Sequence, residues 1–87
     1  MENLIYTNEF LKNLEPFIVK NDLEAVQKIK ETLELISDEK AEKVKLENMK
    51  TKNGEDVFVT PIELKKGLYN LFWAVRENQK ILITVTK

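Results

Sequence analysis

Apolar residues recur at steps of three and four positions along the first part of the chain, which is the period of helices with one buried face. The first such segment spans residues 10–18 and follows Thr7 or Asn8, either of which is a good helix cap. Pro16 interrupts this segment. Because proline destabilises a helix interior, we expect either a kink or a short helix that ends near Leu14.

A second helix is predicted to begin after the capping pair Asn21-Asp22 and to end at residues 37–40, where no glycine is present. Charged residues occupy one side of this segment and apolar residues the other. The residues of the apolar face are Leu23, Val26, Ile29, Leu33 and Ile36. This pattern makes the second helix the most secure element of the sequence.

From Val44 onward the helical period disappears and alternation at every second position replaces it, which is typical of strands. The Asn53-Gly54 pair predicts a two-residue type I′ hairpin, which would place Met49 opposite Phe58. Two apolar stripes follow in the last two strands, and both are expected to point inward. They are Tyr69, Leu71, Trp73 and Val75 in the first strand, and Ile81, Ile83 and Val85 in the second.

The connection between these two strands decides whether the two stripes share a face of the sheet. A two-residue loop would set them on opposite faces, whereas a three-residue loop at 77–79 places Val75 opposite Ile81 and joins the stripes into one core face. The three-residue loop is therefore the one we expect. It also places Arg76 opposite Lys80 on the outer face of the sheet.

These elements predict an α+β fold in which two N-terminal helices pack on one face of an antiparallel sheet of three or four strands. Residues 2–6 predict a short opening strand, which is a candidate for one edge of that sheet. With 87 residues and a mass of 10.2 kDa, the chain is expected to form a single domain over residues 1–87.

Composition narrows the chemistry that the chain can perform. It has no cysteine and no histidine, so disulfides, thiol nucleophiles, Ser-His-Asp triads and metal sites built on these residues are excluded. We expect no metal and no cofactor. The carboxylates of residues 31–42 are interpreted as a solvated helix face.

The net charge is −1, but it is unevenly distributed along the sequence. Residues 1–40 hold nine acids and five lysines, whereas residues 41–87 hold six acids and nine basic residues. A basic field over the whole molecule is therefore absent, and any anion-binding face belongs to the second half. No apolar run is long enough to cross a membrane and no leader pattern is present, so we expect a cytoplasmic protein without a membrane partner.

Two features of the second half are candidate binding surfaces. Lys65 and Lys66 precede a strand that also carries Arg76, so these residues together with Lys80 are candidates for a small basic strip that contacts phosphate. The alternative is a solvated turn and strand surface. Leu68 and Phe72 are apolar groups on the face opposite the inward stripe, which suggests a partner surface unless the first helix or the opening strand covers them.

Several segments of the chain resemble the RelE/HigB family of toxins, including its phage-derived branch. The segments that carry the resemblance are Ile5-Tyr6, residues 10–14, residues 25–36, residues 61–71 with the motif Gly67-Leu68-Tyr69-Asn70-Leu71, and Lys80-Ile81-Leu82. The resemblance implies a β-α-α-β-β-β order and a ribosome-dependent mRNA interferase. It also implies an antitoxin as partner and contact with the ribosome and mRNA.

Carried over onto this sequence, the resemblance implies catalytic roles for Arg76 and Lys80 and RNA contacts by Lys65 and Lys66. Phe72 stands where the family commonly has an arginine, and Lys80 stands where it has a second one. A site with fewer guanidinium groups loses electrostatic stabilisation of the transition state. The resemblance therefore implies an interferase of reduced power.

A second hypothesis comes from a different class of protein. The near-neutral charge and the apolar outer-face residues also fit a non-catalytic inhibitor or regulator of the phage type. Such a protein would dock on a protein partner through Leu68, Phe72 and the open edge of the last strand. The sequence leaves the partner and the oligomeric state open.

Overall fold

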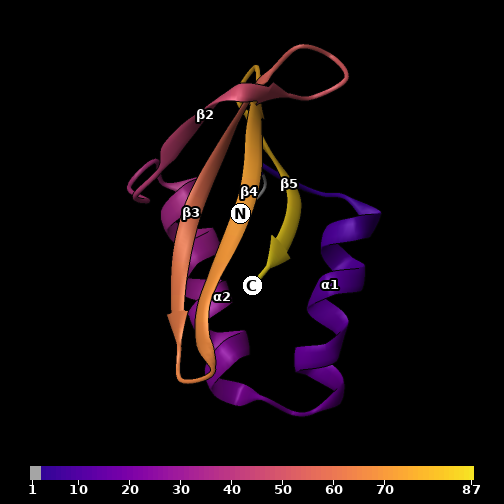
Figure 1. Ribbon diagram of the computed structural model, residues 1–87, viewed down its shortest axis with the longest axis vertical. Coiled ribbons are helices and arrows are strands. Elements are labelled where there is room, and N and C mark those ends of the chain that lie inside the picture. Colours follow the sequence, from indigo (N-terminus) through magenta and orange to yellow (C-terminus); the bar gives the residue numbers. More distant parts are fainter. Residues whose placement is uncertain (1–2) are drawn as a thin grey trace.

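Two helices and five strands make up the computed structural model, which describes residues 3–87 (Figure 1). In chain order they are β1 (Leu4–Tyr6), α1 (Asn8–Val19), α2 (Leu23–Ser37), β2 (Val44–Lys50), β3 (Asp56–Leu64), β4 (Gly67–Arg76) and β5 (Gln79–Thr86). The strands form one sheet in the order β1-β5-β4-β3-β2. The α+β class is therefore correct.

The sheet differs from the prediction in size and in direction. It has five strands rather than three or four, and it is mixed because β1 pairs with β5 in parallel, while the other neighbours are antiparallel. The opening strand is thus confirmed at an edge, although Glu2 lies outside the described residues. Because β1 pairs with residues 80–82 of β5, the expected open edge is wrong for this part of the last strand, and β2 is the edge strand opposite β1.

The helix α1 begins as predicted at a cap formed by Thr7, whose Oγ1 accepts a hydrogen bond from the backbone N–H of Phe10 at 3.1 Å. The expectation of a helix ending near Leu14 is wrong, since α1 continues through Pro16 to Val19. Burial of Phe17 in the core fixes the turn that follows the proline, and Lys20 N–H donates to the Pro16 carbonyl at 3.1 Å. Packing outweighs the local cost of the proline here.

The second helix has the predicted cap and end, but Leu23, which the sequence assigns to its apolar face, is 69% exposed. Asp22 caps it, with Oδ1 accepting from the backbone N–H of Ala25 at 3.2 Å. The helix ends at Ser37, and Glu39 takes a positive φ of 61° in the connection that follows. The side chains that α2 buries are Ala25, Ile29, Leu33 and Ile36.

The main core lies between the two helices and one side of the sheet, which we call the inner face. There α1 packs against β5 and α2 against β3 (Figure 1). The sheet contributes Ile62, Leu71, Trp73, Leu82 and Val85 to this core. The opposite side is called the outer face. Within residues 3–87, no helix packs on it and no helix is long and apolar enough to cross a membrane.

The β4–β5 connection corrects the predicted register. Arg76 faces Gln79 and Val75 faces Lys80, so the loop has two residues, and the expected pairing of Val75 with Ile81 is wrong. A positive φ of 55° at Glu77 closes this short turn. As a result Lys80 shares the inner face with Val75, and the expected pair of Arg76 and Lys80 on the outer face does not form.

A β-bulge in β5 then restores the alternation that the core needs. Phe72 faces Thr84 and Trp73 faces Leu82, so Ile83 is an extra residue between the two pairs. Beyond the bulge Leu71 faces Val85, as the sequence predicts. The inward stripe of β5 is therefore Leu82 and Val85, whereas Ile81 and Ile83 lie on the outer face.

The β2–β3 connection is also longer than expected. Lys50 faces Asp56, and a register shift between Leu46 and Lys50 places Phe58 opposite Lys45 instead of Met49. Gly54 has a positive φ of 85°, but Asn53 does not share this conformation, so the turn is not type I′. Thr51 organises the loop instead: its backbone N–H donates to Glu55 O at 3.0 Å, and its carbonyl accepts from Gly54 N–H at 2.9 Å.

Candidate functional site

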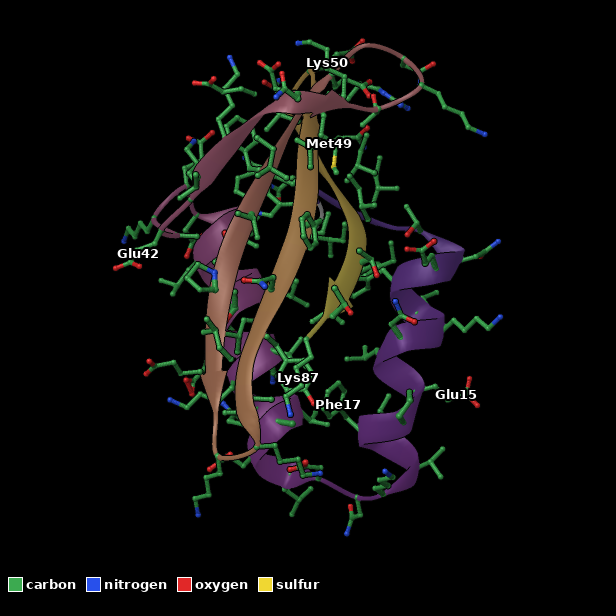
Figure 2. All side chains as sticks on the ribbon, viewed as in Figure 1. Glu15, Phe17, Glu42, Met49, Lys50 and Lys87 are labelled. Atoms are coloured by element: carbon green, nitrogen blue, oxygen red, sulfur yellow. The ribbon has the colours of Figure 1, made fainter. Side chains whose placement is uncertain are left out.

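The outer face of the sheet is apolar although no helix in the described part of the chain covers it. Val57, Ala74 and Ile81 lie side by side there on β3, β4 and β5, and each is less than a tenth exposed. The end of β2 and its loop lie across this end of the sheet, where Figure 2 shows Met49 and Lys50 above β3 and β4. The loop shields one part of the face and leaves a hollow beside it.

That hollow is a groove of about 500 Å³, here called the outer groove. Its apolar lining comes from Met49, Val57, Ile81 and Ile83. A smaller hollow of about 170 Å³ adjoins it and shares three of these residues, and Phe72 lines its far side. The two hollows together form one continuous apolar surface along the middle of the sheet.

Charged residues surround the outer groove. Lys50, Lys52 and Arg76 line it on the basic side, and Glu9 is the acidic side chain among its lining residues. Two of the cations have carboxylate partners within the molecule. Arg76 pairs with Glu55, and both Lys45 and Lys50 pair with Asp56, the former at 3.3 Å.

These pairs change the titration of the carboxyl groups. The hydrogen bond from Arg76 holds the pKa of Glu55 below its ordinary value and raises the pKa of Arg76. The hydrogen bond from Lys50 lowers the pKa of Asp56, and Lys45 adds to the effect. The rim is therefore held as ion pairs at neutral pH, and Lys52 adds a further positive charge.

The two residues predicted as catalytic are not brought together. Arg76 lies at the outer groove, whereas Lys80 is on the inner face and only 5% exposed. Lys80 Nζ donates to Glu39 Oε1 at 3.2 Å, and its side chain lies beside Ile36 and Trp73. A single phosphate group does not reach both cations, because the sheet lies between them.

The two residues predicted to contact RNA lie at the other end of the molecule. Lys65 and Lys66 form the turn between β3 and β4 and pair with acids at the start of α2. Lys66 Nζ is 2.8 Å from Asp22 Oδ2, and Lys65 is 3.7 Å from Glu24 Oε2. Since β4 spans ten residues, or roughly 30 Å, this turn is far from Arg76. The four cations therefore do not form one strip.

The two residues predicted to bind a partner do lie on the outer face. Leu68 faces Glu63 and is 52% exposed, and Phe72 faces Val59 and lines the smaller hollow. The first helix packs on the inner face and β1 extends the sheet beside β5, so neither element covers them. Sequence reasoning missed Met49 and Ile83, because a register shift places the first here and a bulge places the second.

Comparison of the chain with family models, with curated proteins and with solved structures finds no significant match. Within residues 3–87, no group of three or more acidic side chains is arranged to hold a metal ion. The function therefore has to be argued from the surfaces themselves. The outer groove combines a volume of about 500 Å³ with a mainly apolar lining.

Proposed function

We propose that this chain is a non-catalytic binding protein whose outer groove receives an apolar segment of a partner protein. The observation that carries the proposal is the apolar groove in which exposed Met49 and half-buried Phe72 and Ile83 border the buried side chains of Val57 and Ile81. Contiguous apolar surface of this kind marks interaction sites on soluble domains. Aromatic and methionine side chains are also enriched where partners bind, because they offer large and adaptable contact areas.

The charges around the groove indicate which segment would fit. Three cations and one carboxylate line it, so a partner segment with acidic residues beside its apolar ones is complementary. Lys52 is exposed in the β2–β3 loop and lines the groove, so it can contact such a partner. Lys50 and Arg76 pair with Asp56 and Glu55 within the molecule. On binding, the carboxylates of the partner would replace these acids or share the two cations with them.

A photo-crosslinking residue at Met49 tests the proposal in cells. We expect it to capture a protein whose crosslinked peptide is apolar and acidic. Binding of that peptide is then measured by calorimetry for the wild type, for Phe72→Lys and for Val19→Lys. Val19 is an apolar residue of α1 that is 74% exposed and far from the groove, so it is the matched control.

Phe72→Lys is expected to weaken binding at least tenfold, whereas Val19→Lys leaves it unchanged. Equal affinities for the three proteins, or a crosslinked peptide rich in basic residues, would refute the proposal. Self-crosslinking without another protein would replace the partner with a second copy of this chain. Circular dichroism spectra of both variants establish that the fold is retained.

A ribosome-dependent mRNA interferase, which the RelE/HigB resemblance implies, is the second candidate. It is favoured by the cations Lys50, Lys52 and Arg76, which gather at one end of the outer face. Phosphate would have to displace Glu55 and Asp56 from two of them. An antitoxin would then be the partner of the groove.

Cell-free translation of a defined message, followed by mapping of 5′ ends, tests this candidate. Discrete cuts that disappear in a double variant, Lys52→Ala with Arg76→Ala, would support it. Lys28→Ala with Lys30→Ala on the exposed side of α2 is the control. Intact message and normal protein output would exclude the interferase and leave the binding proposal standing.

A further inference from the structure

A second hollow, on the side of the molecule away from the outer groove, has a different chemistry. It is a cleft of about 320 Å³ between the end of α1, the β3–β4 turn and the end of β5. Figure 2 shows Lys87 and Phe17 close together there, and both line the cleft. Its polar lining comes mainly from Lys20, Lys66 and Lys87, with the ring of Tyr69 beside them. We call it the lysine cleft.

The lysine cleft collects positive charge from three separate parts of the chain. Lys20 follows α1, Lys66 lies in the β3–β4 turn, and Lys87 follows β5. No carboxylate side chain is among the lining residues, but Asp22 beside the cleft pairs with Lys66 at 2.8 Å and also interacts electrostatically with Lys20. Three ammonium groups against one carboxylate leave a net positive charge around the hollow, so an anion placed there is favoured.

Two features shape the lysine cleft. The first is Gly67, whose φ is +133° and which leaves room for the end of the Lys87 side chain, since a Cβ there would lie 2.9 Å from Lys87 Cε. The Lys87 Nζ lies 6.0 Å from the centre of the Tyr69 ring. The second is the pairing of Lys66 with Asp22, which ties the β3–β4 turn to the start of α2.

The rest of the lining is apolar and aromatic. The rings of Phe17 and Tyr69 meet edge to face with their centroids 5.4 Å apart, and Pro16 and Val85 complete the wall. A ligand in this cleft would therefore place an anionic group among the lysines and a ring or other apolar group against this wall. The volume is at the lower end of the range for small-molecule sites.

We propose that the lysine cleft binds a small phosphate monoester that carries a ring, with a mononucleotide as the upper limit of size. Lysines act as point charges with rotatable donors and suit the three oxygens of a phosphate dianion, whereas carboxylates are more often bound by the planar fork of arginine. The site lies on the inner side of the sheet. It is therefore independent of the outer groove and of the partner proposed for it.

Titration of the folded protein at low ionic strength tests the inference, with amide chemical shifts and calorimetry as readouts. The probes are adenosine 5′-monophosphate, inorganic phosphate and adenosine. We expect saturable binding of the monophosphate at least tenfold tighter than that of inorganic phosphate, and no binding of adenosine. The shift changes are expected at Phe17, Gly67 and Tyr69, which line or adjoin the cleft.

Matched variants separate this cleft from general attraction to lysines. The double variant Lys20→Gln with Lys87→Gln should bind the monophosphate at least tenfold more weakly than the wild type. The double variant Lys28→Gln with Lys30→Gln, at exposed positions of α2, should bind it with unchanged affinity. Equal weakening by both double variants, shifts at every lysine without saturation, or equal affinity for inorganic phosphate would overturn the proposal. Phe72→Lys should have no effect, so failure of the partner proposal leaves this result interpretable.

Discussion

The hydroxyl of Thr60 is the buried hydrogen-bond partner of the Trp73 indole. Trp73 Nε1 donates to Thr60 Oγ1 at 2.9 Å, and Thr60 Oγ1 in turn donates to the backbone carbonyl of Glu42 at 2.7 Å. Both side chains are less than 5% exposed. One hydroxyl thus joins β3, β4 and the segment that leads into β2. The buried indole N–H of Trp73 therefore has the hydroxyl of Thr60 as its hydrogen-bond acceptor.

Replacing Thr60 with valine is expected to destabilise the protein by about 1–3 kcal/mol, because the indole N–H would be left buried without an acceptor. Valine has nearly the same shape, so the loss reports the hydrogen bond and not a cavity. Urea unfolding followed by Trp73 fluorescence measures it. Thr60→Ser keeps the hydroxyl and is expected to lose less than the valine variant. A larger loss for the serine variant, with the valine variant close to the wild type, would show that the methyl group and not the hydroxyl matters at this position.

The sequence predicts the elements of this fold better than their register. Amphipathic spacing and the caps Thr7 and Asp22 are local signals, and both helices begin where these residues place them. Pro16 is misleading because burial of Phe17, one residue later, is a tertiary effect that outweighs the local preference. The parallel pairing of β1 with β5 joins the two ends of the chain, and alternation within one strand carries no information about it.

The candidate surfaces are harder to predict because each depends on a one-residue change of register. A two-residue turn at Glu77 moves Lys80 to the inner face, and the bulge at Ile83 returns Val85 to the core. A regular strand would need the three-residue loop to bring Val85 into the core, whereas a two-residue loop achieves the same only with the bulge. The sequence does not reveal the bulge. Leu68 and Phe72 were placed correctly because β3 and β4 pair without interruption around them.

Lys80 is expected to act as a structural residue through its aliphatic stem, which is buried against the inner face. Lys80→Ala should therefore destabilise the protein by about 2 kcal/mol, because apolar contact is lost. Lys80→Met keeps the stem and removes the charge, and it should be neutral or stabilising, as is common when buried ionic groups are replaced by apolar ones. Chemical denaturation of the two variants gives the comparison. A methionine variant as unstable as the alanine variant would instead assign the stabilisation to the pair with Glu39.

The ion pair between Asp22 and Lys66 predicts a dependence of stability on pH. The hydrogen bond from Lys66 lowers the pKa of Asp22 below its ordinary value near 3.8, and the backbone N–H of Ala25 adds to this shift. A carboxyl group whose pKa is lower in the folded state stabilises the fold at pH above the unfolded value, and this contribution is lost as the pH falls through the folded value.

Asp22→Asn keeps a capping side chain but removes the charge, so it isolates this contribution. The urea midpoint of this variant should lie below that of the wild type between pH 5 and 7, and the difference should shrink steadily below about pH 4. Lys66→Gln should behave similarly and add little to the effect of Asp22→Asn when the two are combined. A difference that persists unchanged to pH 2 would show that the effect of Asp22 is not electrostatic.

The bulge in β5 predicts that Ile83 can be deleted without loss of the fold. In the shortened strand Lys80, Leu82 and Val85 would still face inward, because removal of the extra residue leaves a regular alternation. The expected cost is about 1–2 kcal/mol, for the loss of one partly buried apolar side chain. Deletion of Val59 is the control, since β3 and β4 pair without interruption there and every position before the deletion would be turned to the opposite face.

Thermal unfolding and amide spectra of the two deletion variants test this difference. The Ile83 deletion should unfold cooperatively near the wild type, whereas the Val59 deletion should lose cooperative unfolding. Ile83 lines both hollows of the outer face, so the fold-preserving deletion should also weaken capture at the outer groove while leaving the lysine cleft unchanged. If the Ile83 deletion unfolds the protein, the bulge is a structural requirement and not an insertion. In that case the bulge would be needed for the stability of the fold, and its contribution to the outer groove would be secondary.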